Sequence, residues 1–184
     1  MSFASAVSRR NMGYRHNPKM LTVRSKQFVN QIIMNTSIPR IPPPIYFLIG
    51  LIAMILLSSF VPVGRWLHFP WRYIGIIIIV LGFYLFLGSG MFFRKLGTNP
   101  RPGTQATLIV TKGPFKYTRN PMYLGLITML IGTSILLGTF SPLIVIPTVF
   151  LILHTQFVLR EEKWMAEWFG EPYLEYKKKT PRWL

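Results

Sequence analysis

The chain contains 184 residues, the size of one domain, and carries 21 Lys and Arg residues against only five acidic ones, all Glu. Hydrophobic residues make up 51% of the sequence, and long uncharged apolar runs separate the basic residues. This pattern is typical of membrane proteins with cationic loops and argues against a soluble nucleic-acid-binding protein. The absence of cysteine excludes disulfides and cysteine-based metal sites, and the three dispersed histidines do not indicate a metal centre.

The first 40 residues form a basic segment with seven Lys and Arg residues and no acidic residue. The segment lacks the apolar stretch of a secretory signal, and its composition also fits an organelle transit peptide. We expect residues 1–40 to form a flexible tail that lies on anionic lipid headgroups. The prolines that follow predict a stiff, extended entry into a transmembrane domain that covers residues 41–184.

Four uncharged apolar segments each have about 18 or more residues, enough to cross roughly 30 Å of hydrocarbon as an α-helix. These segments are residues 44–61, 73–93, 122–140 and 142–159. The uncharged stretch 138–142 is too short for anything but a tight turn. The predicted fold is an all-α integral membrane bundle of four transmembrane helices, with a loop at 94–121 and a C-terminal cytosolic helical segment at 160–184.

Positive charge predicts the orientation of this bundle. The N-terminal tail carries seven Lys and Arg residues, the 94–121 loop six and the segment after Leu159 six, whereas the turns between them carry only Arg65 and Arg72. Loops rich in Lys and Arg face the cytoplasm. We therefore expect a multi-pass protein with both termini and the 94–121 loop on the cytoplasmic side.

The acidic residues all lie close to the end of the last apolar segment. That segment is expected to continue as a helix, with Gly170 at its end and Pro172 in the first turn of another short helix. Charge at a membrane boundary is costly and often functional. Three adjacent residues at this boundary are therefore candidates for function: Arg160, Glu161 and Glu162.

The stretch Lys112–Gly125 is a basic loop, marked by Gly113 and Pro114, that runs directly into an apolar segment. Asn120 and Pro121 have a structural interpretation, because Asn is a favoured N-cap and Pro a favoured first helical residue. The same helix start also offers unpaired N–H groups and a positive dipole to an anion such as a carboxylate.

Two further candidates lie inside apolar segments. Gly88 and Gly90 form a short Gly-x-Gly that either allows close helix packing or contributes to a ligand site. His154 lies two turns before Glu161, on the same face of a continuous helix. A histidine within a span tends to face the bundle interior, where it either lines a site or makes a structural hydrogen bond.

Taken together, these residues resemble the superfamily of isoprenylcysteine carboxyl methyltransferases and phospholipid methyltransferases, which are integral membrane enzymes. The resemblance covers roughly residues 75–184. The matching pattern is Gly97-Thr98, Leu108-Ile-Val-Thr-Lys-Gly-Pro-Phe-Lys-Tyr-Thr-Arg-Asn-Pro-Met-Tyr-Leu-Gly125, Arg160-Glu-Glu162, Phe169-Gly-Glu-Pro-Tyr173, Tyr176 and Pro181-Arg-Trp-Leu184.

The resemblance implies S-adenosylmethionine (SAM) as the methyl donor, held between transmembrane helices and the C-terminal segment. Asn120 stands where many members of the family have histidine, so its amide can donate a hydrogen bond but cannot act as an acid or base. From the resemblance and the residues together, the predicted catalytic residues are Arg119, Arg160 and Glu162. The predicted cofactor-binding residues are Gly88, Gly90, Lys112, Gly113, Asn120, Pro121, Tyr123, His154, Glu161 and Glu162.

The residues leave the chemistry of the acceptor open. Transfer from SAM needs alignment more than acid–base catalysis, because its methyl group is already activated. A carboxylate acceptor would need Arg119 or Arg160 as an orienting cation, whereas an amine acceptor would need Glu161 or Glu162 to take its proton. Both kinds of residue are present.

The predicted function is SAM-dependent methylation of a lipophilic acceptor that enters from the bilayer. Of the two candidate reactions, carboxyl O-methylation of an isoprenylcysteine-type acceptor is favoured slightly over phospholipid N-methylation. One alternative is an NADPH-dependent membrane reductase of the steroid 5-alpha-reductase-like type, because those enzymes have a related Arg-His-Pro-x-Tyr element. Another is a non-enzymatic lipid-binding membrane protein. The paired glutamates favour the methyltransferase, and no nucleic-acid partner is expected.

Overall fold

The computed structural model describes residues 41–97 and 108–184. These residues belong to one compact unit, Ile38–Leu184. The predicted tail at 1–40 and the centre of the predicted loop, residues 98–107, lie outside the described residues.

The described part of the chain is helical, as predicted. Its α-helices are α2 (Pro43–Phe60), α3 (Ile74–Lys95), α4 (Pro121–Leu137), α5 (Val145–Leu153), α6 (Leu159–Phe169) and α7 (Glu171–Lys179). The shorter turns are the 3₁₀ turns η2 (Trp71–Tyr73), η3 (Gly113–Lys116) and η4 (Ser141–Ile144) and the π-helical turn η5 (His154–Val158), which joins α5 to α6. Within these residues there is no strand, only an isolated bridge between Arg65 and Thr139.

Among the described helices, three are long and apolar enough to cross a membrane: Pro43–Phe60, Trp71–Lys95 and Ser141–Phe169. The fourth, α4, is apolar but has only 17 residues, because Gly138 ends it in the left-handed conformation at φ +70°. A helix of this length extends about 26 Å. A helical membrane bundle is thus confirmed, whereas the count of four spanning helices stays a prediction.

The C-terminal segment follows its predicted course. The helix that begins in the last apolar segment continues through Phe169 and ends at Gly170, whose φ of +59° suits glycine. Pro172 lies in the first turn of α7, where its missing N–H costs no helical hydrogen bond.

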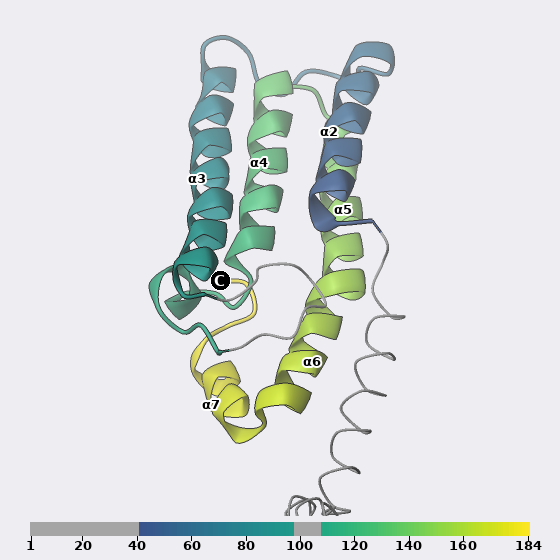
Figure 1. The fold of residues 1–184 in the computed structure, drawn as a ribbon. Coiled ribbons are helices and arrows are strands. Elements are labelled where there is room, and N and C mark those ends of the chain that lie inside the picture. Colours follow the sequence, from purple (N-terminus) through teal and green to yellow (C-terminus); the bar gives the residue numbers. More distant parts are fainter. Residues whose placement is uncertain (1–40, 98–107) are drawn as a thin grey trace, which may run out of the picture. The chain divides into compact units, whose positions relative to one another are not determined.

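The central helix of the bundle is α4, which Figure 1 shows between α3 on one side and α2 with α5 on the other. Ten residues of α4 are buried, whereas α2 and α3 bury three each. Met54 of α2, Leu130 of α4 and Leu153 of α5 have no exposed surface and form the middle of the core. The many exposed apolar side chains of α2 and α3 suit contact with lipid.

Four glycines set the distance between α3 and α4. A Cβ atom added at Gly82 would lie 2.7 Å from the carbonyl oxygen of Gly125, and one added at Gly125 would lie 2.7 Å from that of Gly82. Gly75 and Gly132 make the equivalent contact two turns away. Because a spacing of seven residues is close to two helical turns, the glycines line one face of each helix. The two backbones therefore approach each other as closely as glycine allows.

We expect Gly82→Ala to destabilise the bundle, because the added methyl group would push α3 away from the Gly125 carbonyl. The matched control is Gly88→Ala, since a Cβ at Gly88 meets nothing within 4 Å among the described residues. In detergent, the melting temperature of Gly82→Ala should be about 5 °C lower than that of the unchanged protein, as expected for overpacking. The melting temperature of Gly88→Ala should change by less than about 2 °C. Equal melting temperatures for the two variants would contradict the packing.

Candidate functional site

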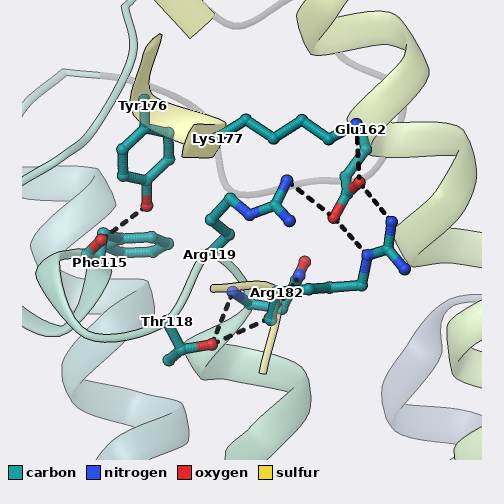
Figure 2. A network of polar contacts seen from close by, with 8 residues as sticks. Phe115, Thr118, Arg119, Glu162, Tyr176, Lys177 and Arg182 are labelled. Carbon is teal, nitrogen blue, oxygen red and sulfur yellow. Dashed lines mark hydrogen bonds and ion pairs between the residues drawn. The ribbon is translucent and has the colours of Figure 1, made fainter. Parts of the chain in front are cut away.

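The candidate site is centred on Glu162, a residue of the first turn of α6 that is only 6% exposed. Figure 2 shows three cationic side chains converging on its carboxylate. Arg182 donates from Nε to Oε1 at 2.7 Å and from Nη2 to Oε2 at 3.0 Å. Arg119 Nη1 lies 3.1 Å from Oε1, and Lys177 Nζ lies 3.7 Å from Oε2. One carboxylate therefore contacts residues from three other parts of the chain.

The charges in this cluster do not balance, because a single carboxylate faces three cations. Buried charge is tolerated only when it is paired and hydrogen-bonded, so loss of Glu162 would leave the cations to repel one another. The hydrogen bonds to Glu162 raise the pKa of Arg182, which fixes its charge. The buried Nε of Arg119 has no hydrogen-bond partner among the described residues. The cluster thus retains both excess positive charge and an unused donor.

The segment after α7 crosses the start of α4. The backbone N–H of Arg119 donates to the carbonyl of Pro181 at 3.0 Å, and the hydroxyl of Thr118 donates to the carbonyl of Arg182 at 3.1 Å. The side-chain amide of Asn120 donates to the same carbonyl at 3.0 Å. Backbone and side-chain contacts together fix this segment against the residues that precede α4.

Asn120 occupies the N-cap position of α4, and its predicted contact with the cofactor stays a prediction. Pro121 is the first residue of α4, as expected, but the Asn120 side chain makes no capping hydrogen bond to the helix. Its amide instead donates a hydrogen bond to the backbone carbonyl of Arg182. The side chain faces the C-terminal segment because that segment offers a carbonyl oxygen, which is an acceptor that a helix N-terminus lacks.

The two adjacent glutamates have separate partners. Tyr123 of α4 donates its hydroxyl proton to Glu161 Oε1 at 2.6 Å, whereas Glu162 contacts the cations. Successive residues of a helix point about 100° apart, which explains the division. The half-buried Glu161 thus ties α6 to α4 on a second side of the helix.

The short helix α7 docks on the described end of the predicted loop. Tyr176 donates its hydroxyl to the carbonyl of Phe115 at 2.6 Å, and the Phe115 ring packs edge-on against Phe93 at a centroid distance of 4.7 Å. Burial, followed by the neighbouring Tyr173, raises the pKa of Tyr176 to about 12, so the hydroxyl stays protonated and can donate. This contact places Lys177, the next residue, near Glu162.

His154 begins the π-helical turn η5, and this turn changes its position relative to the glutamates. A π turn inserts one residue into the α-helical ladder and rotates the following residues by about 100°. His154 therefore does not share the face of Glu161 that a continuous helix would give it. Its ring stacks on Phe150 at 5.8 Å and lies 6.0 Å from Trp183, and its buried Nδ1 has no partner in the described structure.

Among the described residues, no contact with the Glu162 cluster is seen for Gly88, Gly90, Lys112 or Gly113. A Cβ added at Gly88 would meet nothing within 4 Å among the described residues, and one added at Gly90 would lie 3.7 Å from the Met122 side chain. Lys112 and Gly113 are exposed at the start of η3. Arg160 donates to Gln156 at 3.1 Å, one turn earlier on the same helix. The cofactor roles of these residues stay predictions.

Two residues of the cluster, Lys177 and Arg182, are absent from the predicted site. Arg182 lies within the matching pattern at Pro181–Leu184, but nothing in the sequence indicates that this stretch folds back onto Glu162. The available signal is the charge balance after Leu159, where six basic residues accompany all five glutamates. A buried glutamate in such a segment is expected to find its counter-ions nearby.

Comparisons with known proteins match most of this chain. A family model described as phospholipid methyltransferase matches residues 71–172. The protein-S-isoprenylcysteine O-methyltransferase of Schizosaccharomyces pombe is 31% identical over 150 residues, which cover 73% of this chain and 63% of that protein. The Xenopus laevis protein of the same name is 31% identical over 60% of this chain and 39% of its own length. The chain thus spans less than two thirds of the curated relatives it matches.

A solved structure has a similar fold. The eukaryotic intramembrane Ras methyltransferase, an isoprenylcysteine carboxyl methyltransferase, superimposes with a TM-score of 0.55 at 19% sequence identity. The match covers 74% of this chain and 50% of that protein. At this identity the likeness supports a shared helical membrane fold.

The ion pairs predict that Glu162 and Arg182 stabilise the fold as a unit. Glu162→Gln should lower the free energy of unfolding by about 3 kcal/mol, because it leaves buried cations without a counter-charge. In the Arg182→Met background the same change should cost at least about 1 kcal/mol less. Denaturant unfolding of both single variants and the double variant measures this coupling.

The control for this double-mutant cycle is Glu175→Gln. It removes an exposed carboxylate of α7 that has no ion pair among the described residues. It should change the stability by less than about 0.5 kcal/mol. Additive effects of Glu162→Gln and Arg182→Met would show that the two side chains do not act together.

Proposed function

The chain belongs to the phospholipid methyltransferase family, and we propose that it is a membrane methyltransferase that uses SAM to methylate the carboxylate of a lipophilic acceptor. The observation that carries this proposal is the buried pair of Arg119 and Glu162 beside the start of α4, with two further cations on the same carboxylate. The curated relatives are named for O-methylation of isoprenylcysteine, which is a lipidated carboxylate.

The residues present fit SAM as the cofactor. Glu161 and Glu162 offer carboxylate oxygens to the cationic groups of a ligand, and the N-terminus of α4 attracts a ligand carboxylate. The unused Nε of Arg119 is a donor that an anionic group of a second ligand can occupy. When bound, SAM would supply an activated methyl group to the acceptor. Arg119 and Glu162 would then hold the anionic acceptor beside the cationic methyl donor.

The cluster favours a carboxylate acceptor over an amine. An amine acceptor needs a base, but Glu162 already accepts from Arg182 and faces two more cations, so it is a poor proton acceptor. A carboxylate acceptor arrives deprotonated and needs no base. The excess positive charge around Arg119 would attract it and orient one oxygen toward the methyl group.

Phospholipid N-methylation is the second candidate, because the family model that matches is described by that chemistry. In that case Glu161 would be the remaining carboxylate for the amine proton. Its Oε1 accepts the Tyr123 hydroxyl at 2.6 Å, and its other oxygen accepts no hydrogen bond from the described residues. In both cases the acceptor would come from the bilayer, and the reaction would take place at the cytoplasmic face.

The first test is an acceptor assay with the purified protein in lipid nanodiscs and SAM labelled in its methyl group. N-acetyl-S-farnesylcysteine should accept label, and its carboxamide, which lacks the ionised oxygen, should not. The product should release labelled methanol in base, since a methyl ester is hydrolysed and a methylamine is not. Base-stable label in phosphatidylethanolamine would instead establish lipid N-methylation.

The second test concerns Arg119. Arg119→Gln should raise the KM for the carboxylate acceptor about tenfold or more, because a hydrogen bond to a charged group contributes about 1.5–3 kcal/mol. Lys116→Gln removes the same charge from an exposed position of η3 and should change KM less than twofold. Equal effects of the two substitutions would show that Arg119 acts only through long-range charge.

A further inference from the structure

The carboxylate of Glu162 is surrounded by the cationic groups of three side chains. An ionised carboxylate has two oxygens with about four lone-pair sites in total. Oε1 faces Arg119 Nη1 and Arg182 Nε, and Oε2 faces Arg182 Nη2 and Lys177 Nζ, as Figure 2 shows. A cationic ligand group that approaches Glu162 therefore meets like charge, and displacement of one of the three side chains would relieve this repulsion.

The three cations differ in how firmly they are held. Arg182 makes two hydrogen bonds to Glu162, and its carbonyl accepts two more from the residues before α4. The Arg119 side chain is 8% exposed, and its backbone N–H donates to Pro181. Lys177, by contrast, is 42% exposed and lies 3.7 Å from Oε2, beyond hydrogen-bonding distance. Lys177 is thus the side chain that a ligand can displace.

We propose that the place of the Lys177 ammonium beside Glu162 Oε2 is a binding subsite for the ammonium of the cofactor's amino-acid group, with Lys177 as an internal competitor. The inference rests on the proposed function. Exchange of one ammonium for another leaves the charge of the cluster unchanged. A ligand ammonium added beside a retained Lys177 would instead place two like charges together, which is unfavourable.

The exchange requires only the Lys177 side chain to move. Tyr176 anchors α7 through its hydrogen bond to the Phe115 carbonyl, so the helix backbone can stay in place. The lysine side chain has a flexible four-carbon stem and a strongly hydrated ammonium, and it can turn outward into water. Arg119 and Arg182 then keep Glu162 in position for the ligand.

The test is calorimetric titration of the full chain with S-adenosylhomocysteine, which carries the same amino-acid group as SAM. Lys177→Met should lower the Kd about threefold, the size expected for loss of a partly exposed ion pair. Lys178→Met removes the same charge from the next, exposed position of α7 and should leave the Kd within about 1.5-fold. The deamino analogue of the ligand should bind Lys177→Met no more tightly than the unchanged protein.

Three results would overturn the inference in distinguishable ways. If the unchanged protein binds S-adenosylhomocysteine and Lys177→Met binds it equally or more weakly, Lys177 is not a competitor, but the proposed cofactor stands. If the deamino analogue gains affinity in Lys177→Met by the same factor, the subsite does not bind an ammonium. If neither protein binds S-adenosylhomocysteine, both the cofactor and the subsite are wrong.

Discussion

The ionic contact between Glu162 and its three cations is the constraint on which the site depends. Without it, Arg119 before α4, Lys177 of α7 and Arg182 after α7 would place mutually repelling charges near one another. The C-terminal segment therefore forms part of the site rather than an appendage to the bundle. The carbonyl oxygen of Arg182 also accepts from both Thr118 and Asn120, so the same residue supplies both charge and a hydrogen-bond acceptor.

The bundle and the site are held together by different forces. Between α3 and α4 the contact is apolar and depends on glycines that let two backbones meet. At the start of α4 the contacts are polar and depend on long side chains from distant parts of the chain. Because α4 takes part in both, a shift of α3 against α4 would be transmitted to Arg119 and Tyr123, which flank the helix start.

The elements could be predicted from the sequence to a larger extent than the site. The apolar runs predicted the helices, the turn at 138–142 was expected near the end of α4, and Gly170 marked the end of α6, because these features depend on local composition and backbone conformation. The resemblance placed Arg119 and Glu162 in one site. The roles of Lys177 and Arg182 could not be predicted, because they depend on how the chain folds back after α7. The glycine spacing of seven in both helices was a readable signal for the α3–α4 contact.

The π turn at His154–Val158 has a consequence for how the chain can vary. Loss of one residue there would restore a regular α-helix and turn Glu161 and Glu162 by about 100° away from Tyr123 and the cations. The number of residues in this turn therefore sets the helical phase of both carboxylates. Substitutions in the turn leave this phase unchanged, whereas single-residue insertions and deletions shift it, unless a second length change compensates for them.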